Sequence, residues 1–413
     1  MLESSVGKEN HKSIIMLSRE KARDEILQID SPNILCELPT SFGKTRIALE
    51  LLKSKIPEDK CNSTDTHILI VIPRLVLIDN WKDEFKKWGM ESYLPYVEFV
   101  TYVSFPKKAG VWSMVIFDEV HHLSTRCRDY LDAFIMGYCF MLSATVGREL
   151  KKELKVLFPD LYTYKVSTKQ AIQEEILPDP RVYLIPMTLD NTRVRYQIVK
   201  NKSQKVELVI PYHRRFDYAK VKNRRIVIEC TQKQYYDDMS AMIAWYKNKM
   251  FNEVFKNLFL RKSGDRLKWL SEQKSEFVKT ILASLIDQRT LTFCNGIAQT
   301  EELGTCCINS KNTKQSKENL EQFNDGLIDH ITACNMLDEG VNLVNCRVGV
   351  YAVLNSSERM IKQKLGRLLR HPDPVIIIPY FKGTRDQELV EKMLEDYNPQ
   401  LVTTITNLTE LKL

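Results

Sequence analysis

The sequence predicts an α/β protein in which two parallel-sheet domains follow one another, with a small β-plus-helical insertion between them. In the first and last thirds of the chain, short apolar runs alternate with longer amphipathic segments. This alternation is typical of buried parallel strands covered by helices. The middle of the chain departs from it, because short β-like segments there precede a long helical stretch with few Gly or Pro residues.

The apolar runs are short enough to be single strands buried on both faces. In the first half they are 34–38, 67–72, 97–101, 114–117 and 139–142. In the last third they are 290–294, 305–308, 331–334, 348–353 and 375–379. Amphipathic segments such as 75–88 and 358–369 predict the helices that cover these strands.

The middle segments predict short antiparallel strands and then helices. The expected strands are 182–187, 196–199, 206–210 and 225–229, and the helical stretch is 232–287. We therefore expect a first α/β domain over 1–165, an accessory β element and helical connector over 166–287, a second α/β domain over 288–395 and a C-terminal tail over 396–413.

Length and composition fit an ordinary globular protein of two or three domains, with 413 residues, 44% of them hydrophobic and 27% charged. The ten cysteines include no CxxC pair, so they predict small core residues in a reducing compartment rather than a zinc ribbon. The N-terminus has no apolar signal region, and no apolar stretch has membrane-spanning length. We expect a cytoplasmic protein, or one made in a host cytoplasm, without a membrane partner.

Positive charge is concentrated between residues 193 and 225. This window holds eleven basic and two acidic side chains, a net of +9 in a chain whose total is +7. A phosphate-bearing partner suits such a patch, and a solvated β-hairpin with basic edges explains it equally well. The arginines of the window are Arg193, Arg195, Arg214, Arg215, Arg224 and Arg225.

The first predicted strand runs into a phosphate-binding pattern that ends in Gly-Lys-Thr. In a strand–loop–helix of this kind, backbone N–H groups and the helix N-terminus face the phosphates. Lys44 would reach the β- and γ-phosphates, and the Thr45 hydroxyl would bind magnesium. The full pattern has glycine six residues before the lysine, where this chain has Leu38. The segment comprises Pro39, Thr40, Ser41, Phe42, Gly43, Lys44 and Thr45.

A second group follows the apolar run 114–117, which delivers two adjacent carboxylates to the end of a strand. Open α/β sheets bind ligands at that edge. Asp118 would hold magnesium and Glu119 would polarise an attacking water. An acidic first turn of a helix would explain one of the two acids, but it leaves the preceding apolar run unexplained.

A third group lies on the predicted helix near residue 366. Arg367 and Arg370 are three residues apart and therefore share one helical face, with Gln363 one turn earlier. Two aligned guanidinium groups suit the charge that develops on a transferring phosphoryl group. When this segment is taken alone, a basic, solvent-facing helix explains it better.

Together, these segments resemble the superfamily-two helicases of the broad DEAD/DEAH group, with an XPB-like and type III restriction-subunit-like character. Segment 39–45 resembles motif I, and Asp118-Glu119-Val120-His121 is a DEVH form of motif II. Ser143, Ala144 and Thr145 match motif III. Segments 289–295, 337–342 and 363–370 resemble motifs IV, V and VI, and all six follow the family's order over most of the chain.

The resemblance implies two RecA-like domains with ATP and Mg²⁺ between them. Gln363, Arg367 and Arg370 would act from the second domain, the two arginines as finger candidates. His121, Ser143, Ala144 and Thr145 would couple the nucleotide to domain movement, and Gly340 and Asn342 would contact nucleotide and nucleic acid. The resemblance also implies phosphate-backbone contacts at Pro73, Arg74, Thr101 and Tyr102.

The chain departs from the family's motifs at several positions. Ser41 stands where relatives have glycine, Arg74 where they have a small hydroxyl residue, and Lys364 where they have the first arginine of motif VI. Cys334 replaces a motif V threonine. The helix predicted at 18–27 offers no adenine-reading glutamine, which leaves nucleotide-base selectivity open.

We therefore expect an ATP-dependent helicase or translocase, a monomer that favours DNA over RNA. Two alternatives stay open. One is the motor subunit of a restriction or remodelling complex, which would move on duplex without unwinding it and would rely on a partner such as a nuclease or a repair or replication factor. The other is a clamp or sensor in which ATP only regulates binding.

Overall fold

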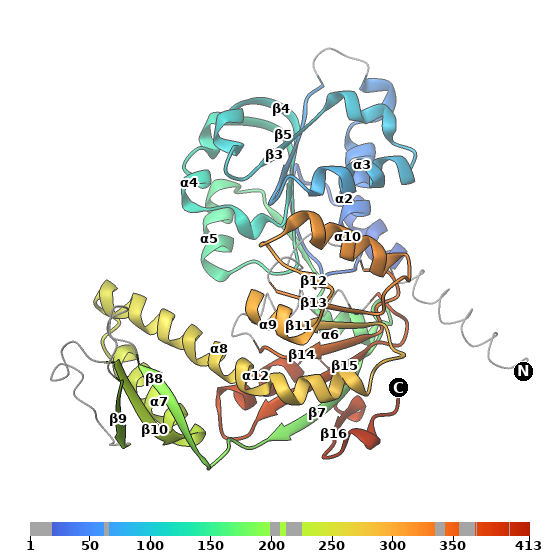
Figure 1. The fold of residues 1–413 in the computed structure, drawn as a ribbon. Coiled ribbons are helices and arrows are strands. Elements are labelled where there is room, and N and C mark those ends of the chain that lie inside the picture. The colour runs from blue at the N-terminus through green and yellow to red at the C-terminus, as the bar shows by residue number, and fades with distance from the viewer. Residues whose placement is uncertain are drawn as a thin grey trace, which may run out of the picture.

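A computed structural model describes residues 19–61, 66–198, 207–211, 225–334, 343–354, 368, 370–395 and 397–413. Within these residues the chain forms two parallel sheets and a third, three-stranded sheet. Figure 1 shows the first α/β domain in blue to teal and the second, largely in orange and red, beside it. The predicted pair of parallel-sheet domains is confirmed.

The first sheet has six parallel strands in the order β3-β2-β4-β5-β1-β6. Their bounds are Val97–Thr101, Ile68–Ile72, Gly110–Asp118, Phe134–Ser143, Asn33–Glu37 and Tyr162–Lys165. Alternate residues of each central strand face opposite sides, so Ile70 packs in one core cluster and Val71 in another. Helices α2 (Lys44–Lys55) and α3 (Leu77–Lys87) cover the first side, whereas α5 (Arg148–Leu157) covers the second.

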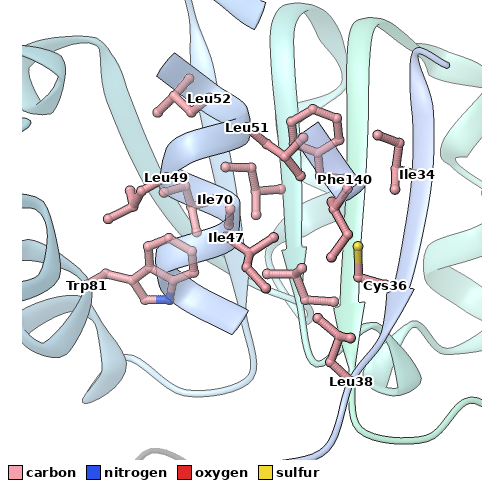
Figure 2. Close-up of a cluster of buried hydrophobic side chains, with 14 of the residues drawn as sticks. Ile34, Cys36, Leu38, Ile47, Leu49, Leu51, Leu52, Ile70, Trp81 and Phe140 are labelled. Carbon is pink, nitrogen blue, oxygen red and sulfur yellow. The ribbon is translucent and has the colours of Figure 1, made fainter. Parts of the chain in front are cut away.

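Figure 2 shows the first of these core clusters, between α2 and the sheet. Ile47 and Leu51 of α2 lie on the side of the helix that faces strand residues such as Phe140 and Cys36. Burial of this apolar face fixes α2 on the sheet. The N-terminus of α2 therefore has a defined position at the end of β1.

Strands β4, β5 and β1 are neighbours in this sheet, in that order. Because the strands are parallel, their carboxyl ends lie at one edge, with Asp118 beside Leu142 and Glu37 beside Ser143. The three segments that resemble motifs II, III and I leave the sheet from these three ends. The fold therefore brings them together without any special loop.

The second sheet has seven parallel strands in the order β12-β13-β11-β14-β15-β7-β16. Their bounds are Cys307–Ile308, His330–Ala333, Thr290–Phe293, Val348–Tyr351, Val375–Phe381, Arg181–Met187 and Val402–Thr404. The accompanying helices include α9 (Ile297–Leu303), α10 (Thr313–Asn324) and α12 (Arg385–Leu394). Strand β11 carries most of the segment that resembles motif IV, whereas the segments that resemble motifs V and VI lie largely outside the described residues.

The strand expected at 182–187 is present, but the antiparallel pairing expected for it was wrong. Strand β7 instead lies parallel between β15 and β16, and Figure 1 shows it in green among strands from the far end of the sequence. Val182 to Ile185 are all buried, which is the pattern of a strand covered on both faces. Residues 396–413, which the sequence analysis assigned to a C-terminal tail, include strand β16 of this sheet. Ile405 of the same segment is buried in the core of the second domain.

The accessory part has a three-stranded sheet, β8-β10-β9, followed by two long helices. The strands are Arg193–Ile198, Arg225–Thr231 and Glu207–Pro211. Strand β8 pairs antiparallel with β10 as expected, whereas β9 is parallel to β10, which corrects the prediction for that strand. The thirteen residues between β9 and β10 are long enough for the crossover that parallel pairing needs.

Helix α7 (Gln232–Lys247) begins with a capping box between Thr231 and Gln234 and packs against α8 (Glu253–Ala283). Only the second half of α8 is buried, from Trp269 to Ile281, because it packs on the second sheet. Both helices lie within the stretch 232–287, for which the sequence predicts helix. No helix in the described ranges is both long and apolar enough to cross a membrane.

Candidate active site

The loop between β1 and α2 has the geometry of a phosphate cradle. Ser41 and Gly43 both have positive φ angles, 67° and 100°, which turn the backbone sharply before Lys44 begins the helix. The N-cap Gly43 makes no side-chain cap, and no acidic residue lies in the first turn. A Cβ added at Gly43 would meet nothing within 4 Å, so the helix end is open on that side. Its N–H groups suit an anion.

Lys44 and Glu119 form an ion pair at this edge of the sheet. The Lys44 Nζ lies 3.0 Å from the Glu119 Oε1, and the two side chains are 11% and 13% exposed. A lysine that would contact phosphate and a carboxylate that would activate water therefore face the same space. The Glu119 carboxylate occupies the place next to Lys44 that a nucleotide phosphate would take.

Glu119 also connects the loop of motif II to that of motif III. Its second oxygen, Oε2, lies 3.2 Å from the Ser143 Oγ and 3.3 Å from the His121 Nδ1. The same His121 nitrogen is 2.8 Å from the Ser143 Oγ. Glu119 adopts a left-handed backbone conformation, φ 52°, and this strained conformation lets two consecutive carboxylates leave β4 in different directions.

The environment of Glu119 keeps its carboxylate ionised. Burial raises its pKa, but the charge of Lys44 and the interactions with His121 more than offset burial, and the pKa lies well below the ordinary value. An ionised carboxylate accepts hydrogen bonds and can orient a water for attack.

Asp118 receives two hydrogen bonds that settle its position. The Tyr102 hydroxyl donates to its carbonyl oxygen at 2.8 Å, and the Trp81 indole N–H donates to its Oδ2 at 3.1 Å. Among the described residues no cluster of three or more His, Cys, Asp or Glu could hold a metal ion by itself. One carboxylate and the Thr45 hydroxyl fit a magnesium ion that takes its other ligands from phosphate and water.

Glu37 is a site residue that the sequence analysis missed. Its side chain is 3% exposed, accepts a hydrogen bond from the Val146 N–H at 2.9 Å and pairs with the Lys151 Nζ at 2.5 Å. Glu37 thus ties the strand before motif I to the loop after motif III. An acid at the end of an otherwise apolar strand was the signal that could have revealed it.

Arg370 reaches the first domain from the second. Its Nε lies 3.3 Å from the Ser41 Oγ of the phosphate loop. Arg370 is exposed, yet the protein around it desolvates the guanidinium enough to lower its pKa, and the charge of Glu84 opposes that effect. Leu368 anchors this segment on β14, because a Cβ added at Gly349 would collide with the Leu368 side chain. Gln363, Arg367, Gly340 and Asn342 lie outside the described residues.

The residues expected to contact nucleic acid are only partly where the resemblance placed them. Pro73 and Thr101 lie at the carboxyl ends of β2 and β3, and Arg74 is exposed there. Tyr102 corrects the prediction: its side chain is 5% exposed and its hydroxyl bonds to Asp118, so it packs inward.

Within the basic window, Arg193 is exposed on β8. Arg195 and Arg225 belong to β8 and β10, but their side chains are outside the part of the chain that the structure describes, as are Arg214, Arg215 and Arg224 altogether. The expected role of this window stays a prediction.

The fold and the site define a class. Two parallel α/β sheets, a phosphate loop, an adjacent Asp-Glu pair and an arginine from the second domain are the parts of a two-domain P-loop nucleoside triphosphatase.

Comparison with known proteins narrows this class. Residues 15–108 match the family described as type III restriction enzyme, res subunit, and residues 273–372 match the helicase conserved C-terminal domain. The DNA 3'-5' translocase XPB2 of Sulfurisphaera tokodaii is 24% identical over 389 residues, covering 87% of this chain and 80% of the relative.

Solved structures share the fold. Dbp5 of S. cerevisiae bound to RNA and ADP BeF3 has a TM-score of 0.57 at 10% identity, over 94% of this chain and 89% of that one. A fragment of a putative HsdR subunit of a type I restriction enzyme from Vibrio vulnificus has a TM-score of 0.54 at 16% identity, over 94% and 68%. The two family matches and this relative together support a superfamily-two helicase of the XPB-like and type III restriction-like kind, an ATP-hydrolysing motor that acts on nucleic acid.

Proposed function

We propose that the protein is a magnesium-dependent DNA translocase that couples ATP hydrolysis in the cleft between its two α/β domains to movement along DNA. The observation that carries the proposal is the convergence of Lys44, Glu119 and Arg370 on the phosphate loop from both domains. These are the charges that phosphoryl transfer to water needs.

The residues divide the chemistry among them. Lys44 exchanges its carboxylate partner for phosphate when nucleotide binds, and this exchange releases Glu119 to orient the attacking water. Thr45 and Asp118 would hold Mg²⁺, and the ion would supply positive charge to the phosphate oxygens. Arg370 stabilises charge on the γ-phosphoryl group from the second domain.

A contact between motifs II and III offers a path from chemistry to movement. Ser143 and His121 both lie within hydrogen-bonding distance of the Glu119 carboxylate. A change at Glu119 on hydrolysis therefore alters the loop that Ser143 begins. Loss of the phosphate bridge between Lys44 and Arg370 then lets the domains part, so the grip on the strand shifts.

DNA is favoured as the track because the relative of Sulfurisphaera tokodaii is named a DNA translocase and aligns over most of this chain. The net charge of +9 within residues 193–225 supports a phosphate-binding role for the accessory part. We propose a cytoplasmic monomer as the working form.

A second candidate is the motor subunit of a larger complex that moves on duplex without separating strands. The match of residues 15–108 to the res subunit family favours it. Such a subunit would depend on a partner for any cleavage or strand separation.

The test is steady-state ATPase activity of the full chain without nucleic acid and with single-stranded DNA, duplex DNA, forked DNA or single-stranded RNA. Glu119→Gln is the inactive control. Stimulation by DNA above RNA is expected, and strand-displacement and triplex-displacement assays then separate unwinding from translocation. Equal activity in every arm would refute a nucleic-acid-driven motor and favour a clamp that uses ATP only as a switch.

A further inference from the structure

Asp118 receives a hydrogen bond from a residue outside every helicase motif of this chain. Trp81 lies on α3, and its indole N–H donates to the Asp118 Oδ2 at 3.1 Å. The Trp81 side chain is 2% exposed. An indole N–H can only donate, so it occupies one of the two carboxylate oxygens of Asp118 in a fixed direction.

Trp81 also contacts the helix that carries the phosphate-binding lysine. Its ring belongs to the same core cluster as Ile47 of α2 and Ile70 of β2. In Figure 2 the indole nitrogen is on the side of Ile47 rather than Leu52, towards the end where α2 begins. The two groups expected to hold magnesium, Thr45 and Asp118, come from α2 and β4. Trp81 shares a core cluster with α2 and donates a hydrogen bond to the last residue of β4.

We propose that Trp81 is a positioning residue for the magnesium–nucleotide site, which holds the Asp118 carboxylate in the orientation that the ion requires. This inference rests on the proposed function of Asp118 and Thr45. Partners of metal-binding carboxylates set their direction, and losing such a partner weakens metal binding about ten- to a hundredfold.

A buried tryptophan also needs a hydrogen-bond partner for reasons of stability alone. The chain provides a matched comparison in Trp112, on the same strand as Asp118, whose indole N–H donates to the Lys108 carbonyl at 2.8 Å. Trp112 lies six residues from Asp118 and bonds to a carbonyl rather than to the site. Phenylalanine at either position keeps an aromatic ring and removes the donor.

The experiment compares wild type, Trp81→Phe and Trp112→Phe as full chains. A fluorescent, non-hydrolysable ATP analogue is titrated with EDTA present and with increasing Mg²⁺, and thermal unfolding is recorded without ligand. We expect Trp81→Phe to bind the analogue normally in EDTA, but to need about ten- to a hundredfold more Mg²⁺ for the tighter binding. Trp112→Phe should match wild type in both conditions.

The Mg²⁺ concentration that Trp81→Phe requires distinguishes a positioning role of Trp81 from a role in fold stability alone. If Trp81→Phe unfolds at a lower temperature but keeps the wild-type Mg²⁺ requirement, Trp81 is a core residue and the proposal is wrong. An equal loss of binding with and without Mg²⁺ would also overturn it.

A measurement on wild type covers the case in which Trp81→Phe does not fold. The chain has five tryptophans, so the indole N–H resonances are few and can be assigned by single substitutions. Adding Mg²⁺ to the analogue-bound protein should shift the Trp81 resonance, as should Asp118→Asn without ligand, while the Trp112 resonance stays in place. A Trp81 resonance that ignores both changes would refute the proposal.

These results are separable from the fate of the proposed function. Magnesium-dependent nucleotide binding through Trp81 without any stimulation by nucleic acid would refute the DNA translocase and leave the inference standing. A DNA-stimulated ATPase whose Mg²⁺ requirement is unchanged in Trp81→Phe would support the DNA translocase and refute the role of Trp81.

Discussion

The guanidinium Nε of Arg370 lies 3.3 Å from the Ser41 hydroxyl oxygen, although 329 positions separate them in the chain. Arg370 follows the buried Leu368 of the second domain, and Ser41 lies in the phosphate loop of the first. The contact places a charged group of one domain where the other would hold a nucleotide. Arg370 would need to change only its partner, from the serine hydroxyl to a phosphate oxygen, to contact a nucleotide bound at this loop.

Replacing Arg370 by alanine should slow hydrolysis much more than it weakens nucleotide binding. An arginine that stabilises transition-state charge contributes on the order of a thousandfold to turnover. Steady-state kinetics give kcat, and equilibrium titration gives the affinity. Arg385→Ala is the control, because that arginine pairs with Glu388 on α12. A variant that loses affinity but keeps kcat would show that Arg370 is not a finger.

Replacing Ser41 by glycine should stabilise the chain. Ser41 has a φ of 67°, a conformation that glycine adopts without strain and serine does not. We expect the free energy of unfolding to rise by up to about 1 kcal/mol, since the relieved strain exceeds both the added entropy of the unfolded chain and the loss of the exposed contact with Arg370. Ser104→Gly is the matched control, with φ −93°, and should destabilise. Chemical denaturation measures the free energy of unfolding of both variants. If both lose the same amount of stability, the Ser41 backbone is not strained.

Glu119→Gln should bind ATP, fail to hydrolyse it and change the acid sensitivity of the fold. Folding lowers the pKa of Glu119, so the unfolded chain takes up this proton first as pH falls. The stabilisation by ionised Glu119 is complete above the ordinary value of 4.5 and is lost progressively below it. The difference in melting temperature between wild type and Glu119→Gln should therefore narrow below pH 4.5. A constant difference down to pH 3 would contradict the lowered pKa.

Glu37 offers a test of the link between motifs I and III. Glu37→Ala leaves the Val146 N–H and the Lys151 ammonium without this carboxylate, and should cost about 1–3 kcal/mol of unfolding free energy. Lys151 is 30% exposed, so solvent screens its share. Glu37→Gln keeps an acceptor for Val146 and should cost less. Chemical denaturation measures the free energy of unfolding of both variants. If both lose the same amount, the effect comes from the ion pair with Lys151 alone.

Neutralising the arginines of residues 193–225 should flatten the salt dependence of DNA binding. Each phosphate contact contributes about 0.9 to the slope of log affinity against log salt. Glutamine at all six arginine positions should lower the slope by as much as about five units if every one contacts phosphate. The control neutralises Lys256, Lys262 and Lys268 of α8, which pair with acidic neighbours. An unchanged slope would show that the arginines of residues 193–225 do not contact DNA phosphates and are only a solvated surface.

Much of the site could be predicted because its chemistry is local in the sequence. Lys44 and Thr45 follow a buried strand, and Asp118 and Glu119 follow another. Parallel strands place such carboxyl ends at one edge, so the meeting of Lys44 with Glu119 follows once the strands are recognised. The strands themselves were recognisable because they are short, apolar and bounded by polar segments.

Other features could not be predicted because they depend on contacts between distant segments. Strand β7 is apolar enough for either a central or an accessory position, and only the packing of β15 and β16 on its two sides decides between them. Tyr102 has the sequence position of a nucleic-acid contact, yet its stacking on Phe117 and its hydrogen bond to the Asp118 carbonyl hold it inward.

The sequence by itself determined the class of protein, because strand periodicity and the order of phosphate-binding residues are properties of short segments. Tertiary structure alone decided which side chains complete the site, namely Trp81 on Asp118, Glu37 on Val146 and Arg370 on Ser41. Each joins residues far apart in the chain, and a buried polar group takes whichever partner the packed core brings within reach.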